Sequence, residues 1–261
     1  METVGVNVTH DASFCRCVNG EIDLFLEEER LSRKKHDNMP VKTVLEFQEN
    51  NFAGVTGLEY HDYSLRDTCN FFDVIFRKKI PDHDYRTYNQ HHYLHACCGF
   101  YNSGFEEADV VVVDGLGNFF DEEHHECATR WYIKKPSEIK LLERQGASRF
   151  GTKTDRHGYW PMGIGMAYAS ISDYLGFGQL GSGKVMGLAP YGKEDPNIKP
   201  FVIDGRVNSK LFYRTKYSAN FIPYDYLPEK VSVKDQRFMN LAYRLQKDFE
   251  KDKFLKDLHF S

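Results

Sequence analysis

The chain has 261 residues, of which 41% are hydrophobic and 15% are aromatic, and its formal net charge is -4. This length and composition predict a folded chain with a real core and exclude an intrinsically disordered one. Because 34 basic and 38 acidic residues nearly balance, neither a nucleic-acid coat nor an acidic tail is indicated.

Short stretches of the sequence indicate where in the cell the protein is located. Residues 1–10 have neither the basic segment nor the apolar segment of a signal peptide, and the densest apolar stretch, residues 108–113, is too short to span a bilayer. The six cysteines contain no C-x-x-C pair, which favours reduced thiols over a zinc ribbon. We therefore expect a cytoplasmic protein without a membrane partner.

The first third of the chain has the pattern of a β-meander followed by a helix. β-branched and alternating residues indicate the strands, and Asn19-Gly20 is a strong signal for a two-residue hairpin. The predicted elements are strands over residues 3–8, 14–18 and 21–27, a turn over 10–13, a charged segment over 28–36 and a helix over 40–51.

Helix and strand patterns then alternate to the end. The predicted elements are a helix over residues 88–102, a buried strand over 108–114, strands over 127–134 and 139–144, a helix over 161–177, a glycine-rich segment over 176–192 and a helix over 235–258. This order predicts a mixed α/β fold, with a sheet flanked by helices.

A histidine pair gives the sharpest local chemical signal. On the predicted helix, His91 and His95 lie one turn apart on the same face, a spacing that lets two imidazoles bind one metal ion. His92 points about a quarter-turn away and is a weaker candidate. Histidines four residues apart also occur by chance on helix surfaces, so the pair alone does not decide for a metal.

Asp114 strengthens the metal hypothesis. It ends an apolar strand and is followed by glycine, and ligands of open α/β sheets gather at the carboxyl ends of strands. A His, His, Asp set with open positions suits non-haem iron, and zinc is the competing divalent metal. The alternative for Asp114 is a turn cap at a strand end.

Three other segments have both a functional and a structural interpretation. His10 follows the first strand, where it can bind a substrate carbonyl or move a proton, or simply form a turn with Asp11. The cationic run that contains Lys35 either stabilises an anionic intermediate or is a solvated surface. The acidic and histidine-rich run 121–126 is a second possible metal cluster, although a solvated turn is favoured.

Residues 178–184 fit the G-x-x-x-x-G-K spacing of a phosphate-binding loop, but two features argue against that assignment. Val185 stands where the magnesium-binding hydroxyl is needed, and the segment follows a predicted helix rather than a strand. Lys184 therefore remains a candidate for an anion contact or for packing.

Several motifs in order resemble the carbamoyltransferase family of the NodU and antibiotic O-carbamoyltransferase type, over essentially the whole chain. They are His10-Asp11-Ala12-Ser13, Glu27-Glu-Glu-Arg30, Arg33-Lys-Lys-His36, His91-His-x-x-His95-Ala96, Asp114-Gly115, Tyr174-Leu-Gly-Phe177 and Gly183-Lys-Val-Met-Gly-Leu-Ala-Pro-Tyr-Gly192. The resemblance implies an actin-like ATPase (ASKHA, RNase H-like) fold. It also implies transfer of a carbamoyl group from carbamoyl adenylate to a hydroxyl of a small-molecule acceptor.

The resemblance also implies roles for individual residues and for co-substrates. His91, His95 and Asp114 match the family's metal ligands, while His10 and Lys35 match residues of its carbamoyl-transfer site. In such enzymes a YrdC-like domain makes carbamoyl adenylate from ATP and carbamoyl phosphate. Lys35, His10 and the metal would then oppose the negative charge that grows on the carbamoyl oxygen.

Two departures from the family pattern shape the remaining expectations. Ser182 stands where family members commonly carry an acidic residue. The family's glycine-rich adenosine segment, a later aspartate ligand and the YrdC-like domain have no counterpart, so residues 1–261 are expected to be an incomplete N-terminal domain that needs a C-terminal partner chain. A non-catalytic metal- or nucleotide-binding subunit and a tRNA threonylcarbamoyltransferase-like protein are the alternatives. The near-neutral charge disfavours a nucleic-acid partner.

Overall fold

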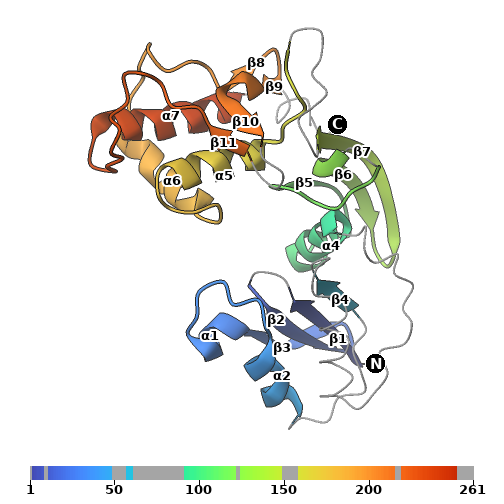
Figure 1. Ribbon diagram of the computed structural model, residues 1–261. Coiled ribbons are helices and arrows are strands. Elements are labelled where there is room, and N and C mark those ends of the chain that lie inside the picture. Colours follow the sequence, from blue (N-terminus) through green and yellow to red (C-terminus); the bar gives the residue numbers. More distant parts are fainter. Residues whose placement is uncertain are drawn as a thin grey trace. The chain divides into compact units, whose positions relative to one another are not determined.

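The computed structural model describes residues 2–8, 11–48, 57–60, 91–121, 124–148, 158–214 and 219–251 (Figure 1). The chain divides into two compact units, Met1–Gln90 and His91–Ser261, which we call unit 1 and unit 2. Among the residues that the structure describes, no helix combines the length and the apolar character needed to cross a bilayer.

Unit 1 contains a sheet with the strand order β3-β2-β1-β4. The strands are β1 (Glu2–Val8), β2 (Ser13–Val18), β3 (Glu21–Glu27) and β4 (Gly57–Tyr60). The first three form an antiparallel meander, and β4 pairs in parallel with β1. The predicted meander is confirmed, with Asn19 (φ 54°) and Gly20 (φ 90°) both in the left-handed region that a tight hairpin turn requires.

Two helices follow the meander. The charged segment leaves the sheet as predicted and forms α1 (Glu28–Ser32), and α2 (Val41–Gln48) confirms the next predicted helix, whose residues 49–51 lie outside the described part. The buried Glu28 carboxylate accepts the backbone N–H groups of Lys42 and Thr43 at 3.0 and 2.8 Å. An acidic side chain at a helix N-terminus satisfies unpaired donors and is favoured by the helix dipole. Glu28 therefore ties α1 to α2.

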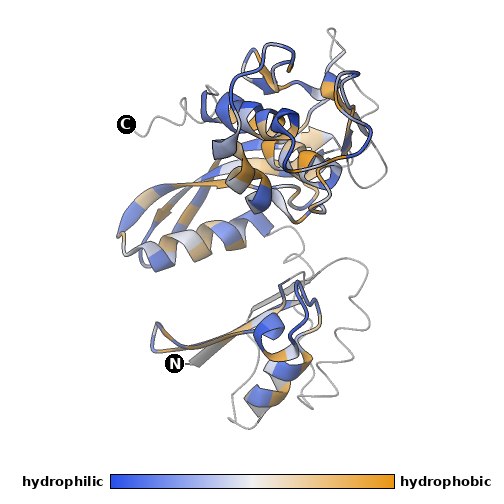
Figure 2. Ribbon diagram, turned by 90° about the vertical axis from the view of Figure 1, so that its left-hand side faces the viewer, coloured by the Kyte–Doolittle hydropathy of each residue, from blue (hydrophilic) through white to orange (hydrophobic). Residues whose placement is uncertain are grey.

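Unit 2 begins with helix α4 (His91–Ser103) on an antiparallel sheet of the order β5-β6-β7. The strands are β5 (Glu107–Val113), β6 (His124–Lys134) and β7 (Glu138–Ser148), which confirms the three predicted strands with longer bounds. Ala96 and Phe100 of the helix pack against Trp131 and Ile133 of the sheet. Figure 2 shows the helix lying along the strands.

The strand before Asp114 differs from its prediction. Its residues are mostly half-buried rather than buried, and β5 is antiparallel to its neighbour β6. An antiparallel sheet covered by a helix on one face leaves its other face solvated, so even a run of valines is only half-buried there. Asp114 nevertheless follows the strand's carboxyl end, as expected.

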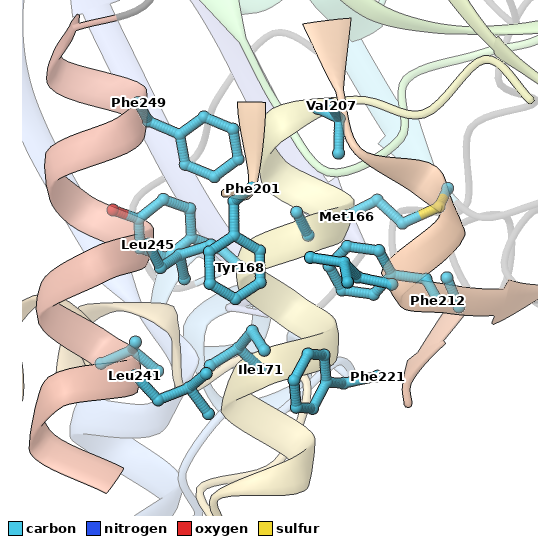
Figure 3. Packing of buried hydrophobic residues seen from close by; sticks show 14 of the residues in the cluster. Met166, Tyr168, Ile171, Phe201, Val207, Phe212, Phe221, Leu241, Leu245 and Phe249 are labelled. Carbon is cyan, nitrogen blue, oxygen red and sulfur yellow. The ribbon is translucent and has the colours of Figure 1, made fainter. Parts of the chain in front are cut away.

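The rest of unit 2 is a helical layer with its own core. It contains α5 (Ile164–Tyr174), α6 (Ser182–Leu188), the short 3-10 helix η2 (Ala189–Tyr191) and α7 (Gln236–Lys251). Tyr168 and Ile171 of α5 face Leu241 and Leu245 of α7 across this core, while Met166 points the other way, toward Phe212 (Figure 3). The helices predicted over 161–177 and 235–258 are confirmed with shorter bounds, and residues 252–258 lie outside the described part.

Several short elements in unit 2 were not predicted. They are β8 (Val202–Ile203), β9 (Arg206–Val207), the 3-10 helix η3 (Ser209–Leu211), β10 (Phe212–Arg214) and β11 (Ala219–Phe221). Phe212 and Phe221 of the last pair are buried in the helical core. Elements of two or three residues contain too little sequence for a period-2 pattern to be recognised.

Candidate metal centre

Helix α4 places two histidines one turn apart at its start. His91 is its first residue, and the backbone N–H of His91 donates to the Asn118 side-chain carbonyl at 2.8 Å. The first N–H groups of a helix have no partner within it, so this bond supplies the missing acceptor. Asn118 thereby ties the first turn of α4 to the loop after β5.

Asp114 directly follows the end of β5, and backbone contacts hold it in place. Its backbone N–H donates to the carbonyl of Cys127 at 3.2 Å, and its Oδ1 accepts the N–H of Gly115 at 2.6 Å. Gly165 of α5 lies directly against this turn, since a Cβ at that position would stand 2.5 Å from the carbonyl carbon of Asp114. The strand end, the turn and helix α5 together fix the backbone of Asp114.

The side chains of His91, His95 and Asp114 converge. The distance from His91 Nε2 to Asp114 Oδ2 is 2.7 Å, and that from His91 Nε2 to His95 Nε2 is 3.2 Å. One potential ligand atom from each residue lies within 4.8 Å of the others. Metal–ligand bonds of about 2.1 Å put neighbouring donors on one ion roughly 3 Å apart, so this donor set fits a divalent cation.

The three donors also leave room for further ligands. The His91 side chain is 23% exposed and that of Asp114 is 36% exposed, while His95 is exposed to solvent. The His91 and His95 rings meet nearly at right angles, at 84°. Two imidazoles and one carboxylate with a solvent-facing side form the kind of site that non-haem iron or catalytic zinc uses to accept an exogenous oxygen ligand.

The electrostatics keep Asp114 charged. Burial by itself favours the neutral carboxyl, but the His91 hydrogen bond and the Gly115 N–H outweigh it and hold the pKa of Asp114 well below its ordinary value. A carboxylate that remains ionised is the form that binds a cation. The site therefore presents a negative charge beside the imidazoles of His91 and His95.

His92 has a different environment from its neighbours. It is fully buried, its Nδ1 lies 3.0 Å from the Thr129 hydroxyl, and burial lowers its pKa to about 4. A neutral imidazole packed in the core is the expected outcome of such desolvation. His92 is not in the donor group, which agrees with the sequence analysis, where it was the weaker metal-ligand candidate.

Sequence reasoning missed Asn118 and Gly165, which support this group. Asn118 and Gly165 act through contacts between distant segments, and neither stands in a recognisable motif. Buried Glu126 pairs with Arg144 at 3.0 Å beneath the same loop, and burial raises its pKa despite the nearby guanidinium. Glu126 belongs to the 121–126 run that the sequence offered as a second possible metal cluster, and its backbone N–H donates to the carbonyl of Asn118 at 2.9 Å.

Lys35 lies in unit 1. Its ammonium contacts both carboxylate oxygens of Glu29, at 3.0 and 2.9 Å, and it remains largely exposed. The Lys35 contact lowers the pKa of Glu29, so the pair is ionic at neutral pH. His10, the other residue that the family resemblance assigns to the transfer site, lies outside the described residues.

The donor group includes neither Lys184 nor the described residues of the 121–126 run. Lys184 lies on α6, exposed, with its Nζ 5.8 Å from the centre of the Phe177 ring. The segment predicted as a glycine-rich loop is thus helical from Ser182 onward, and it does follow a helix rather than a strand. In the acidic run, His124 pairs with Asp121 at 2.9 Å and begins β6.

Residues 42–252 match the family model of the carbamoyltransferase N-terminus. The chain belongs to this carbamoyltransferase family. The donor group described above lies within the matched region, and so do Lys184 and helix α7. The region also includes every helix and strand that the structure describes in unit 2, whereas Lys35 precedes it.

Three curated relatives resemble the chain at modest identity. The nodulation protein NolNO of Sinorhizobium fredii is 25% identical over 216 residues, which cover 72% of this chain. The nodulation protein NolO of Bradyrhizobium diazoefficiens is 33% identical over 107 residues, or 40% of the chain, and a Synechocystis protein of unknown function is 32% identical over 125 residues, or 47%. The matched segments make up only 28%, 16% and 17% of the lengths of NolNO, NolO and the Synechocystis protein.

Proposed function

We propose that this chain is a component of an O-carbamoyltransferase, which moves a carbamoyl group from carbamoyl adenylate to a hydroxyl of a small-molecule acceptor. The observation that carries the proposal is the family match over residues 42–252. We further propose that the domain is of the actin-like ATPase type. In this account carbamoyl adenylate is made from ATP and carbamoyl phosphate by a YrdC-like domain, supplied by a partner chain.

In this reaction the acceptor oxygen attacks the carbamoyl carbon, the bond from that carbon to the adenylate phosphate oxygen breaks, and AMP leaves. His91, His95 and Asp114 would hold the metal ion, iron or zinc, which when bound supplies a Lewis acid that opposes charge on an oxygen. The convergence of their donor atoms supports this assignment. Asp114 would bind the cation as a carboxylate, and the hydrogen bond that the His91 backbone N–H donates to the Asn118 side-chain carbonyl fixes the helix turn that carries the first imidazole.

Lys35 and His10 have the charge and proton chemistry that the transfer needs. An ammonium group can stabilise negative charge on the carbamoyl oxygen, and a histidine can move a proton. Glu29 holds the Lys35 ammonium by both carboxylate oxygens and so restricts a long, flexible side chain. For Lys184 we propose only a contact to an anionic group, since no described acidic residue pairs with it.

The decisive assay mixes the chain with a candidate partner chain that carries a YrdC-like domain, ATP, labelled carbamoyl phosphate and a panel of hydroxyl acceptors. The panel contains an aminoglycoside, a nodulation glycan and a nucleotide. We expect labelled product and AMP in equal amounts. Asp114→Ala should lower the rate at least about 100-fold, because it removes a ligand.

His124→Ala is the matched control, since His124 is a half-exposed histidine of the same unit outside the donor group. It should keep the wild-type rate. Absence of transfer with every partner and acceptor would overturn the proposal. Tight metal binding without turnover would instead favour the alternative, a non-catalytic metal-binding subunit.

A further inference from the structure

We propose that His36 is the general base that removes the proton from the acceptor hydroxyl, and that Asp11 is the residue that orients it. The inference rests on the proposed carbamoyl transfer and adds a catalytic residue to it. It starts from a side-chain pair in unit 1: His36 Nδ1 lies 2.7 Å from Asp11 Oδ1.

The direction of this hydrogen bond follows from the chemistry of the two groups. An ionised carboxylate can only accept, so a neutral His36 must donate its Nδ1–H to Asp11. The lone pair of the imidazole is then on Nε2, on the opposite side of the ring. The side chain of His36 is 35% exposed and its Nδ1 faces Asp11, so we infer that Nε2 is the ring nitrogen that a bound hydroxyl group reaches. This is the arrangement by which a carboxylate orients a catalytic histidine in other acyl-transfer enzymes.

The fold holds the pair from several sides. The backbone N–H of Ala12 donates to the carbonyl of Asp37 at 2.8 Å, which joins the segment around Asp11 to the segment around His36. The backbone N–H of His36 donates to Glu29 Oε2 at 3.2 Å. Both Asp11 (φ 62°) and His36 (φ 55°) have a left-handed backbone, which is uncommon for residues other than glycine. The surrounding contacts therefore maintain a conformation that neither residue prefers by itself.

The pair stands at the edge of the sheet where ligands of α/β folds bind. Asp11 lies between the end of β1 and the start of β2, and Glu29 follows the end of β3 in helix α1. β1 and β4 are parallel and end at this same edge. Such an edge is the usual location of a site in an open sheet.

The charges around His36 favour a proton-transfer role over metal binding. Asp11, Glu29 and His36 each have a ligand atom within 4.8 Å of the others, which could in principle suit a cation. However, the Lys35 ammonium already occupies both oxygens of Glu29, and Lys34 lies 3.6 Å from Asp37 beside it. Of the two carboxylates in the group, Glu29 pairs with Lys35 and Asp11 contacts His36, so a metal ion would have to displace Lys35.

The proposed step balances as follows. As the acceptor oxygen forms its bond to the carbamoyl carbon, its proton moves to Nε2 of His36. The bond between the carbamoyl carbon and the phosphate oxygen breaks, and AMP leaves with that electron pair. The imidazolium, stabilised by Asp11, then returns its proton to solvent.

The orienting contact can be tested without any transfer assay. Long-range proton–nitrogen NMR spectra of the full chain identify which ring nitrogen of a neutral histidine is protonated. We expect His36 to carry its proton on Nδ1 in the wild type and mainly on Nε2, as in free imidazole, in Asp11→Ala. Asp121→Ala, which removes the partner of the similar surface pair at His124, should leave His36 unchanged. An unchanged His36 tautomer in Asp11→Ala would overturn the orienting role.

The base role is tested by His36→Gln in the carbamoyl-transfer assay, with His124→Gln as the control. We expect His36→Gln to lower kcat about 100-fold or more, which is typical for loss of a general base, and His124→Gln to leave it unchanged. A wild-type rate in His36→Gln would overturn the base role while the proposed function stands. No transfer by the wild-type chain would overturn the proposed function and the base role with it, so the two failures are distinguishable.

Discussion

Asn118 is the residue on which the first turn of α4 depends. Its side-chain carbonyl accepts the His91 N–H from a loop 27 residues further along the chain. Asn118→Ala removes this acceptor and lets the turn with His91 fray. We expect metal affinity to fall about tenfold, as for other residues that orient a ligand, and the free energy of unfolding to fall by about 1 kcal/mol.

A chelator-competition titration and urea unfolding measure these two effects of Asn118→Ala. Asn102→Ala is the control, because Asn102 bonds to a carbonyl near the other end of the same helix. It should leave metal affinity unchanged. Equal metal affinity in Asn118→Ala and wild type would show that this cap does not position His91.

At the residue scale, the sequence predicted the three donor residues but not their supports. His91 and His95 follow from helical spacing, and Asp114 from its place after an apolar strand. The family resemblance, not the spacing, singled out Lys35 for the transfer site. Asn118 could not be predicted, because an N-cap residue usually directly precedes its helix, whereas Asn118 follows the helix in the chain and meets its first turn by a tertiary contact. The pairing of Asp11 with His36 likewise depends on two turns meeting in space.

At the element scale, helix α5 and the turn after β5 depend on one close contact. A side chain at Gly165 would put its Cβ 2.5 Å from both the carbonyl carbon and the carbonyl oxygen of Asp114. Gly165→Ala therefore has to push backbone against backbone. We expect a loss of about 1–3 kcal/mol in the free energy of unfolding, as for overpacking elsewhere, together with weaker metal binding because Asp114 is displaced.

Gly99→Ala is the matched control for Gly165→Ala. Gly99 lies inside α4, and a Cβ there would meet no atom within 4 Å. Alanine should raise stability by about 1 kcal/mol through its higher helix propensity. Urea unfolding with a parallel metal titration measures both variants. A Gly165→Ala protein as stable as the wild type would contradict the close packing described for α5.

The long elements could be predicted because their patterns repeat several times. Helix α7 has apolar residues at helical spacing, and the strands of the meander alternate around a clear Asn-Gly turn. The prediction that β5 is a buried strand was wrong, because a run of valines does not reveal how many faces of its sheet are covered. The strands β8 to β11 could not be found, since two or three residues do not establish a period.

At the scale of the whole molecule, unit 2 should lose stability in alkali. Burial raises the pKa of Tyr168 and Tyr224 well above the ordinary value, and burial raises the pKa of Cys127 to about 12. Above about pH 9 to 10 the unfolded chain releases these protons while the folded chain keeps them. The folded state then binds more protons, so the free energy of unfolding falls as the pH rises.

Tyr168→Phe tests this account. Urea unfolding at pH 8 and pH 11 should show a loss of stability in the wild type that is smaller in Tyr168→Phe by about 1 kcal/mol. Tyr213→Phe is the control, because Tyr213 is 54% exposed. The stability that Tyr213→Phe loses between pH 8 and pH 11 should equal the loss in the wild type. The same loss in Tyr168→Phe as in wild type would contradict the role of the buried phenol.

The division of the chain into two units was the property least predictable from the sequence. The order of elements indicated a mixed α/β fold, which is confirmed, but nothing in the composition marked a division after Gln90. The division depends on how densely segments contact each other, which is a property of the folded chain. The family match extends across it, from unit 1 into unit 2.

The most direct test of the central claim is the metal content of the purified chain after anaerobic loading with Fe(II) and gel filtration. The account predicts about one ion per chain in the wild type and in His124→Ala. It predicts a drop to about one tenth or less in His91→Ala, because two remaining donors hold a divalent ion poorly. Equal metal content in His91→Ala and wild type would contradict the His91, His95 and Asp114 centre.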